Sequence, residues 1–403
     1  MFKHPSYAAS DLGEDSAASL LSLPYIDYVK TEKEPNKAGT TIYKKDKAFS
    51  GYSIYTSDMK PDGFVNLIDM DGKIVHRWAR RNPQSVKVRW EQVTPFPDGS
   101  IFLSCHMGTI DWQWVDVNSH CIDVIDMPGQ SAHHGAYYLK DGGFLGLVSN
   151  MIYIPFRDLM LKVQDNSLVR VSSDGRTLKK ISLRNLFAED LGYHKKLGEF
   201  YDYQKDYLTR SSRGENKKPK FDPFHANNIV NLEWDIPGIA KKGDWLVTVR
   251  HLDRIFIVAP EQERIVWQWG ENIISHPHHA TFLTGDQILL FDNGSNKKSS
   301  RIIVVDIRSG KIVWQYGQKP GQEFFSNLRG SAQRLPNGNT LIADSDSGRA
   351  FEVTISGEVV WEWYVDFLTE GNNKGKRRAV SRIQRVPYDF FKGVQFNYGK
   401  IDP

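Results

Sequence analysis

The chain has 403 residues, of which 40% are hydrophobic and 25% charged, and this is the composition of a globular protein with a large buried core. A net charge of +4 is too small to favour nucleic acid as a partner. No apolar run approaches membrane-spanning length, and the first six residues, Met1-Phe-Lys-His-Pro-Ser6, lack the apolar core of a signal peptide. We therefore expect no nucleic-acid or membrane partner. We also expect a cytoplasmic location for this sequence, or a periplasmic one if a leader has been trimmed from it.

A repeat of strand, turn, strand, polar gap, strand, turn and strand runs along most of the chain. Residues 1–50 precede it as a polar, irregular N-terminal extension. The repeats lie near 51–78, 89–126, 133–183, 225–270, 278–317 and 330–363, and several last strands carry a Gly-x-hydrophobic-hydrophobic-Trp signature, as in Gly310-Lys-Ile-Val-Trp314. Four-strand repeats of this length predict an all-β fold, a six-bladed β-propeller over residues 51–364.

Two further segments interrupt or follow the repeat. Residues 184–220 are expected to form an inserted, partly helical loop. Residues 365–403 begin with a basic linker and continue to Gln384-Arg-Val-Pro387, which echoes Gln333-Arg-Leu-Pro336. The first repeat lacks a clear first strand, so the late segment is expected to supply it. The two ends of the chain would then close the ring.

Three histidines take one place in this pattern. His134, His225 and His278 each lie five residues before the last apolar residue of a first strand, and Glu91 and Gly330 take that place in two other repeats. First strands of propeller blades line the central channel, so we expect the three imidazoles to meet at its mouth. Imidazole acts as a nucleophile, an acid or base, or a metal ligand. The simpler alternative is that each ring caps a strand by hydrogen bonding.

An arginine follows the second strand of the fourth repeat. The guanidinium of Arg250 can turn inward and grip a tetrahedral oxyanion such as sulfate or phosphate. The alternative is a salt bridge at the rim with Asp253 or Asp222. The corresponding places in other repeats hold further polar residues: His106, Asn293 and Ser345.

Two histidine doublets leave secondary candidates. Adjacent residues on a strand point to opposite faces, so His134 and His278 are expected in the site, and His133 and His279 to orient it or bind backbone. Asn293 is read first as a turn residue, with channel contact as the alternative.

Several motifs are absent from the sequence. It has no glycine-rich phosphate loop opening a helix, no HExxH, no paired CxxC and no Gly-x-Ser-x-Gly. A nucleotide donor and a serine hydrolase are therefore not expected, and the leading interpretation requires no cofactor. Cys105 and Cys121 are too few for a disulfide framework and are expected to be thiols.

Residues 221–363 resemble the bacterial arylsulfate sulfotransferases in order and spacing, and Ala132-His-His134 extends the likeness. The matching stretches are Phe224-His-Ala-Asn-Asn-Ile229, Val247-Thr-Val-Arg-His-Leu252, His278-His-Ala-Thr-Phe-Leu283, Leu290-Phe-Asp-Asn-Gly294 and Gly330-Ser-Ala-Gln-Arg-Leu-Pro-Asn-Gly-Asn-Thr-Leu-Ile342. The resemblance implies a six-bladed propeller whose axial site moves a sulfuryl group from an aryl sulfate to a phenol.

The same resemblance implies roles for residues. His278 looks like the histidine that is transiently sulfated, and His225, His134 and Arg250 look like the groups that hold the sulfuryl oxygens and the leaving phenolate. The chain departs from the family pattern at Gly135, where an acid is usual, and at His279, where a carboxylate or small polar residue is usual.

Three functional hypotheses follow. The first is sulfuryl transfer through sulfated His278, with an aromatic sulfate and a phenol as small-molecule partners. The second is a metal-dependent enzyme in which His134, His225 and His278 bind iron, copper or zinc, with help from other side chains: His279, His106 or Glu91. The third is a propeller that only binds a ligand or protein. The sequence leaves the oligomeric state open.

Overall fold

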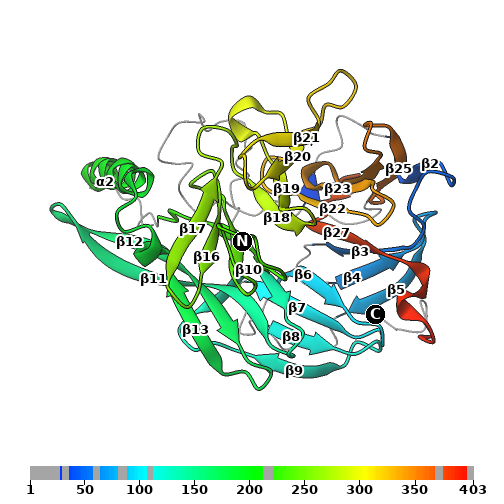
Figure 1. Ribbon diagram of the computed structural model, residues 1–403, viewed down its shortest axis with the longest axis horizontal. Coiled ribbons are helices and arrows are strands. Elements are labelled where there is room, and N and C mark those ends of the chain that lie inside the picture. Colours follow the sequence, from blue (N-terminus) through cyan, green and yellow to red (C-terminus); the bar gives the residue numbers. More distant parts are fainter. Residues whose placement is uncertain are drawn as a thin grey trace.

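The computed structural model describes residues 28–29, 36–57, 64–79, 89–106, 112–211, 221–367 and 375–396. Within these residues, six antiparallel sheets follow one another around a ring (Figure 1). Each sheet holds four consecutive strands or their equivalent, and alternating burial along the strands provides the surfaces on which neighbouring sheets pack. The predicted all-β, six-bladed propeller is confirmed.

The strands of each blade run from the centre of the ring outward. Blade 1 contains β27 (Arg382–Val386), β3 (Tyr52–Ser57), β4 (Phe64–Ile68) and β5 (Ile74–Ala79). Blade 2 contains β6 (Arg89–Pro95), β7 (Ile101–His106), β8 (Trp112–Val115) and β9 (Cys121–Ile125). Blade 3 contains β10 (Ser131–Tyr138), β11 (Phe144–Phe156), β12 (Leu159–Val171) and β13 (Thr177–Ser182).

The second half of the ring follows the same order. Blade 4 contains β14 (Ala226–Asn231), β15 (Trp245–Val249), β16 (Arg254–Ala259) and β17 (Arg264–Trp269). Blade 5 contains β18 (His278–Leu283), β19 (Gln287–Asp292), β20 (Arg301–Asp306) and β21 (Ile312–Tyr316). Blade 6 contains β22 (Ser331–Arg334), β23 (Thr340–Asp344), β24 (Arg349–Val353) and β25 (Val359–Tyr364). Short 3-10 helices are η2 (Ser295–Lys297), η3 (Ser345–Ser347) and η4 (Tyr388–Phe391).

The two ends of the chain close the ring. β27 pairs with β3, from Arg382 opposite Thr56 to Val386 opposite Tyr52, and this is the predicted closing strand. Six buried apolar clusters lie between consecutive blades, including one between blade 6 and blade 1. Every blade therefore buries both of its faces, which is how a ring of sheets becomes one cooperative unit.

Residues 1–27 and 30–35 of the expected irregular extension lie outside the described residues, and the described part differs from that expectation. β2 (Gly39–Tyr43) pairs with β25 as a fifth, outermost strand of blade 6, and β1 (Tyr28–Val29) pairs with β26 (Arg377–Arg378). The β-branched run Thr40-Thr-Ile42 suits an edge strand. It belongs to none of the repeats, so counting repeats could not reveal it.

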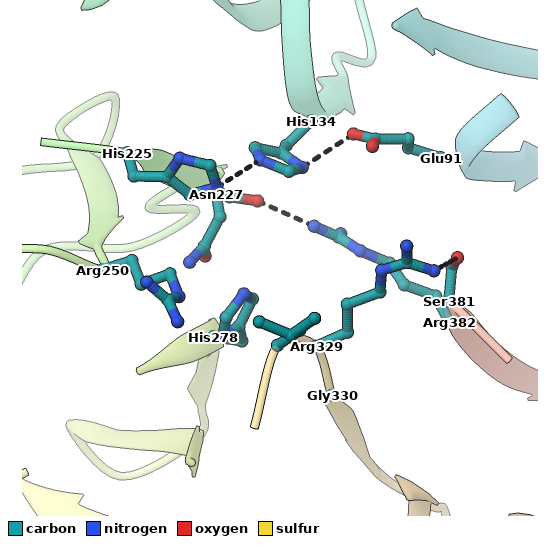
Figure 2. Close-up of a pocket in the computed structure, with 11 residues that line it drawn as sticks. Glu91, His134, His225, Asn227, Arg250, His278, Arg329, Gly330, Ser381 and Arg382 are labelled. Carbon is teal, nitrogen blue, oxygen red and sulfur yellow. Dashed lines mark hydrogen bonds and ion pairs between the residues drawn. The ribbon is translucent and has the colours of Figure 1, made fainter. Parts of the chain in front are cut away.

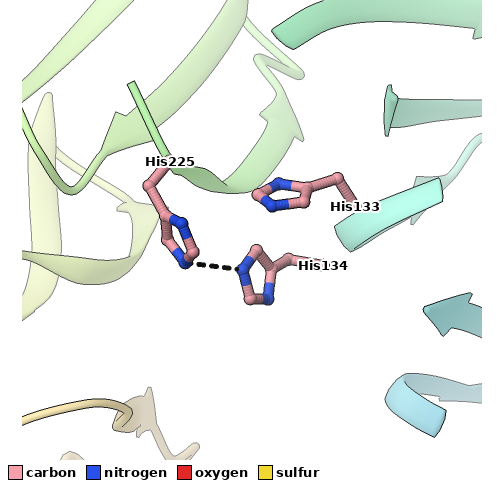
Figure 3. A group of neighbouring side chains, drawn as sticks. All are labelled: His133, His134 and His225. Carbon is pink, nitrogen blue, oxygen red and sulfur yellow. Dashed lines mark hydrogen bonds between the residues drawn. The ribbon is translucent and has the colours of Figure 1, made fainter. Parts of the chain in front are cut away.

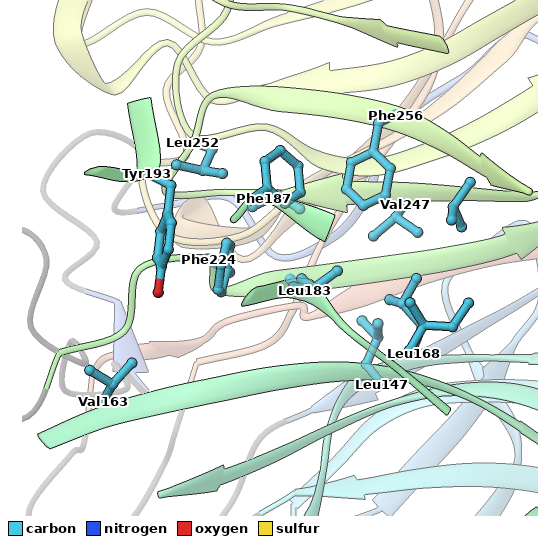
Figure 4. Packing of buried hydrophobic residues seen from close by; sticks show 14 of the residues in the cluster. Leu147, Val163, Leu168, Leu183, Phe187, Tyr193, Phe224, Val247, Leu252 and Phe256 are labelled. Carbon is cyan, nitrogen blue, oxygen red and sulfur yellow. The ribbon is translucent and has the colours of Figure 1, made fainter. Parts of the chain in front are cut away.

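The segment between blades 3 and 4 is partly helical, as predicted. It contains α1 (Leu183–Leu186) and α2 (Leu191–Ser211). The carboxylate of Asp190 accepts the backbone N–H of Tyr193 at 2.9 Å and so caps α2. The helix packs its apolar face against blades 3 and 4 (Figure 4), with Tyr193, Leu197 and Phe200 in the cluster that also holds Phe224. Among the described residues, no helix is long and apolar enough to cross a membrane.

Candidate functional site

One pocket lies on the axis of the ring, because residues on or next to the innermost strands of all six blades line it (Figure 2). It encloses about 650 Å³, part of which is open solvent. The lining residues are Glu91, His134, His225, Asn227, Arg250, His278, Leu328, Arg329, Gly330, Ser381 and Arg382. The four main candidates from the sequence therefore share one pocket.

His134 and His225 lie at the centre of a row of close polar contacts. His134 Nε2 lies 3.0 Å from His225 Nε2, within hydrogen-bond distance, so the two rings can share one proton. His134 Nδ1 lies 2.7 Å from a Glu91 carboxylate oxygen, and His225 Nδ1 lies 2.6 Å from Asp222. Burial acts to raise the pKa of Asp222, but His225 beside it lowers that pKa to about 2.

His278 is in a different electrostatic environment. Burial and the positive charge of Arg250 hold its pKa well below 6.5, so the ring is neutral near neutral pH. Its Nδ1 lies 2.7 Å from Asn293 Oδ1, and Asn293 donates its own amide hydrogens to the carbonyls of Ser326 and Arg329 at 2.7 and 3.0 Å. Those two bonds make Oδ1 the atom that faces His278. His278 therefore carries its proton on Nδ1 and presents the lone pair of Nε2.

Arg250 is buried at the pocket wall beside His278. Of the two carboxylates considered as its partners, Asp222 accepts from His225, and Asp253 accepts the backbone N–H of His276 at 2.7 Å. Arg250 nevertheless lies near enough to Asp253 to act against the rise of its pKa that burial causes. Because the guanidinium is buried, its charge is little screened by water and acts on an anion in the pocket.

The expected common register of the three histidines does not hold in the strand ladders. The residues paired with the first residues of the second strands are Tyr138, Asn231 and Leu283. Counted back from these paired residues, His134 lies four residues before Tyr138, His225 six before Asn231 and His278 five before Leu283.

Local backbone irregularity compensates for these different offsets. The ladders slip in β10, β14 and β18, and His134 (φ 60°) and His225 (φ 47°) adopt the left-handed region that non-glycine residues rarely use. Bulges re-aim side chains next to functional sites. Here they bring side chains from unequal ladder positions into one pocket.

The secondary candidates from the sequence lie in different places. Glu91 lies in the pocket, and Asn293 contacts His278 rather than acting only as a turn residue. His133 is buried behind His134, with Nδ1 2.9 Å from the Ala226 carbonyl. His279 faces a second cavity, with Nδ1 3.1 Å from the Ala332 carbonyl. The side chain of His106 lies outside the described residues.

Sequence reasoning missed the arginine of the closing strand. Arg382 donates to Gln92 at 2.7 Å, to the Asn227 carbonyl at 2.8 Å and to the Asn228 side chain at 3.1 Å. It therefore ties blades 1, 2 and 4 together at the floor of the pocket. The sequence predicted a closing strand in this part of the chain, and an arginine at the start of that innermost strand would have indicated a residue facing the axis. The network also occupies the space beside Gly135, where a Cβ atom would lie 2.9 Å from Gln92.

The ring of six sheets, five of four strands and one extended to five by β2, with an axial pocket defines the class of the protein, a six-bladed β-propeller. A crystal structure of a protein of unknown function from Bacteroides caccae shares this fold, with a TM-score of 0.53 and 16% identity over 84% of this chain and 99% of that one. The virginiamycin B lyase of Staphylococcus aureus (a catalytically inactive variant with quinupristin) gives a TM-score of 0.42 and 13% identity, covering 89% and 90%. No curated protein matches the chain.

The family follows from a separate comparison. The family model described as arylsulfotransferase (ASST) matches residues 160–366, just over half of the chain. The chain therefore belongs to the arylsulfotransferase family. The matched region contains His225, Arg250 and His278, and the first half of the pocket, with Glu91 and His134, lies before it.

Proposed function

We propose that this protein transfers a sulfuryl group from an aryl sulfate to a phenolic acceptor through a sulfated His278. The observation that carries the proposal is the state of His278: a buried neutral imidazole, with Nδ1 bound to Asn293 and Nε2 available, in a pocket that also holds Arg250. A neutral imidazole with an oriented lone pair is a nucleophile. A fixed guanidinium stabilises the negative charge of the sulfuryl oxygens.

In the first half-reaction, Nε2 of His278 attacks the sulfur atom of the donor. A nitrogen–sulfur bond forms, the bond from sulfur to the aryl oxygen breaks, and its electron pair leaves with the phenolate. The proposed reaction requires one extra proton on the His134–His225 pair, and this proton passes to the oxygen. The carboxylates of Glu91 and Asp222 hold the two rings in orientation.

The second half-reaction reverses these transfers. The hydroxyl of the acceptor phenol returns a proton to the His134–His225 pair as its oxygen attacks sulfur. The nitrogen–sulfur bond breaks, and its electron pair returns to His278. The imidazole is regenerated neutral, and the pair again holds one extra proton.

The test uses 4-nitrophenyl sulfate as donor and phenol as acceptor. We expect phenyl sulfate and 4-nitrophenol in equal amounts. Without acceptor, protein held at alkaline pH should carry one sulfuryl group on the peptide that contains His278, measured by mass spectrometry. No acceptor sulfation and no sulfated His278, at neutral and at alkaline pH, contradict the proposal.

The chain offers a matched pair of variants. His278→Asn removes the nucleophile. His279→Asn changes the next residue, which faces the second cavity, and asparagine tolerates its positive φ of 52°. We expect His278→Asn to abolish transfer and His279→Asn to keep it.

A further inference from the structure

Three imidazoles gather at one side of the pocket (Figure 3). His133 and His134 come from β10, and His225 directly precedes β14. Their ring centroids lie 4.3, 4.8 and 5.0 Å apart, and one nitrogen from each ring lies within 4.8 Å of the other two. Three rings at this spacing, from two neighbouring blades, can share one central ion.

Each of these rings has an oxygen atom at its Nδ1. These oxygens belong to the Ala226 carbonyl for His133 at 2.9 Å, to Glu91 for His134 at 2.7 Å and to Asp222 for His225 at 2.6 Å. A nearby oxygen favours the tautomer that carries its proton on Nδ1, which leaves Nε2 as the nitrogen that can bind a metal ion. Imidazoles that bind metal ions almost always donate their other N–H to a carboxylate or a carbonyl in this way.

The one spacing that a hydrogen bond fixes is close to that of shared coordination. With metal–nitrogen bonds of about 2.0–2.1 Å and tetrahedral angles of about 109°, two ligand nitrogens lie about 3.3–3.4 Å apart. His134 Nε2 and His225 Nε2 are 3.0 Å apart, so the two rings need to separate only slightly to hold the ion. We propose that His133, His134 and His225 bind one divalent transition-metal ion of the Zn²⁺ class through Nε2.

Charge and access support this site. The carboxylates of Glu91 and Asp222 supply two negative charges behind neutral rings, which offsets a doubly charged ion. The side chains of His134 and His225 are 14% and 15% exposed toward the pocket, so the fourth position of a tetrahedral ion opens there. Arg250 lines the same pocket and favours an anion or hydroxide in that position.

Two other ligand sets fit less well. Asp222, His225 and His251 also lie close together, but Asp222 is fully buried and accepts both the backbone N–H and the Nδ1 of His225. Only His225 of that set lines the pocket, and His251 is buried behind it. The set expected from the sequence placed His278 third, and in the structure His133 takes its place in the group.

Metal binding can be measured apart from sulfuryl transfer, but the two exclude each other at any one moment. The ion would occupy the space between His134 Nε2 and His225 Nε2, across which the proposed transfer moves a proton. The test therefore measures metal binding and not activity. The full chain, purified without a histidine tag and treated with a chelator, is titrated calorimetrically with Zn²⁺ alone. We expect one ion per chain with micromolar or tighter affinity, and a tetrahedral absorption spectrum when Co²⁺ is used instead.

Variants assign the ligands. We expect His133→Asn and His225→Asn to weaken Zn²⁺ binding at least tenfold, and Glu91→Gln to weaken it about 10- to 100-fold. His279→Asn, whose ring faces the other cavity, should bind as the parent does. Thermal melting identifies variants that fail to fold, and Glu91→Gln leaves all three rings in place for that case. No binding, binding unchanged in His133→Asn and Glu91→Gln, or an octahedral Co²⁺ spectrum overturns the proposal.

Discussion

The three pocket histidines that the sequence singled out are held by different kinds of acceptor. His134 and His225 each contact a carboxylate, whereas His278 contacts the side-chain amide of Asn293. A carboxylate favours a charged imidazole, and an amide oxygen orients a ring without adding charge. The chain thus places two rings beside carboxylates and one neutral ring beside an amide, and the proposed transfer uses the first two for proton transfer and the third as the nucleophile.

Replacing Asn293 by aspartate tests this division. Asn293→Asp keeps the shape but places a negative charge 2.7 Å from His278 Nδ1, the present donor–acceptor distance. The pKa of His278 should rise by about 1–3. Because protonated imidazole is not a nucleophile, activity should fall most at low pH, and the acidic limb of the pH–rate profile should move to higher pH.

The variant also loses the two hydrogen bonds from Asn293 to the carbonyls of Ser326 and Arg329. This loss costs about 1–3 kcal/mol of stability, so the pH profile is compared at a temperature where melting shows the variant folded. A rate lowered equally at every pH, with the acidic limb unmoved, contradicts the assigned role of Asn293.

At the scale of strands, the tryptophan signature joins one blade to the next. The indole N–H of Trp361 in β25 donates to the Met70 carbonyl in the last turn of blade 1 at 2.8 Å. Trp314 in β21 donates in the same manner to Ile355 of blade 6 at 2.9 Å. The repeated tryptophan therefore fills the space between blades and satisfies a turn of the following one.

The two tryptophans differ in burial, which makes them a matched pair. Trp361 is fully buried, and its bond is buried with it, whereas the bond of Trp314 is exposed. Trp361→Phe removes the donor from a buried carbonyl and should cost about 1–3 kcal/mol. Trp314→Phe should cost about 0.5 kcal/mol or less, since water replaces the lost donor. Urea unfolding measures both, and equal losses would show that the indole hydrogen bond is not the cause.

Repeat patterns predicted much of this architecture, because each blade needs the same strands, turns and interior residues. The closing strand was found through Gln384-Arg-Val-Pro387, which copies the turn of blade 6. The extra outer strand β2 could not be predicted in this way, because it belongs to none of the repeats. The bulges at His134 and His225 also escaped notice, because they depend on neighbouring strands rather than on the residues themselves. Asp222 lies just before the fourth repeat, so the repeat pattern does not include it. Arg382 acts through contacts with residues far from it in the sequence.

At the scale of the whole molecule, the ring buries several histidines in uncharged form. Burial is the largest influence on each, and it lowers the pKa of His279 to about 3 and that of His76 to about 4. It holds three others well below 6.5: His251, His276 and His278. The unfolded chain binds protons on all of these below about pH 6.5, and the folded protein does not. Their stabilising effect is therefore complete above that pH and is lost as the pH falls.

We expect the free energy of unfolding to fall steadily between pH 6.5 and 5. Each such histidine contributes up to about 1.4 kcal/mol per pH unit. Buried carboxyl groups with a raised pKa, such as Asp253 and Asp346, take up protons in the folded state and reduce the total. Urea unfolding across this range should still give a net slope above about 1.4 kcal/mol per pH unit. His279→Asn removes one of the protons taken up on unfolding and should lower that slope by up to about 1.4 kcal/mol per pH unit. A free energy of unfolding that stays constant from pH 7 to 5 would show that the buried rings are charged in the folded state.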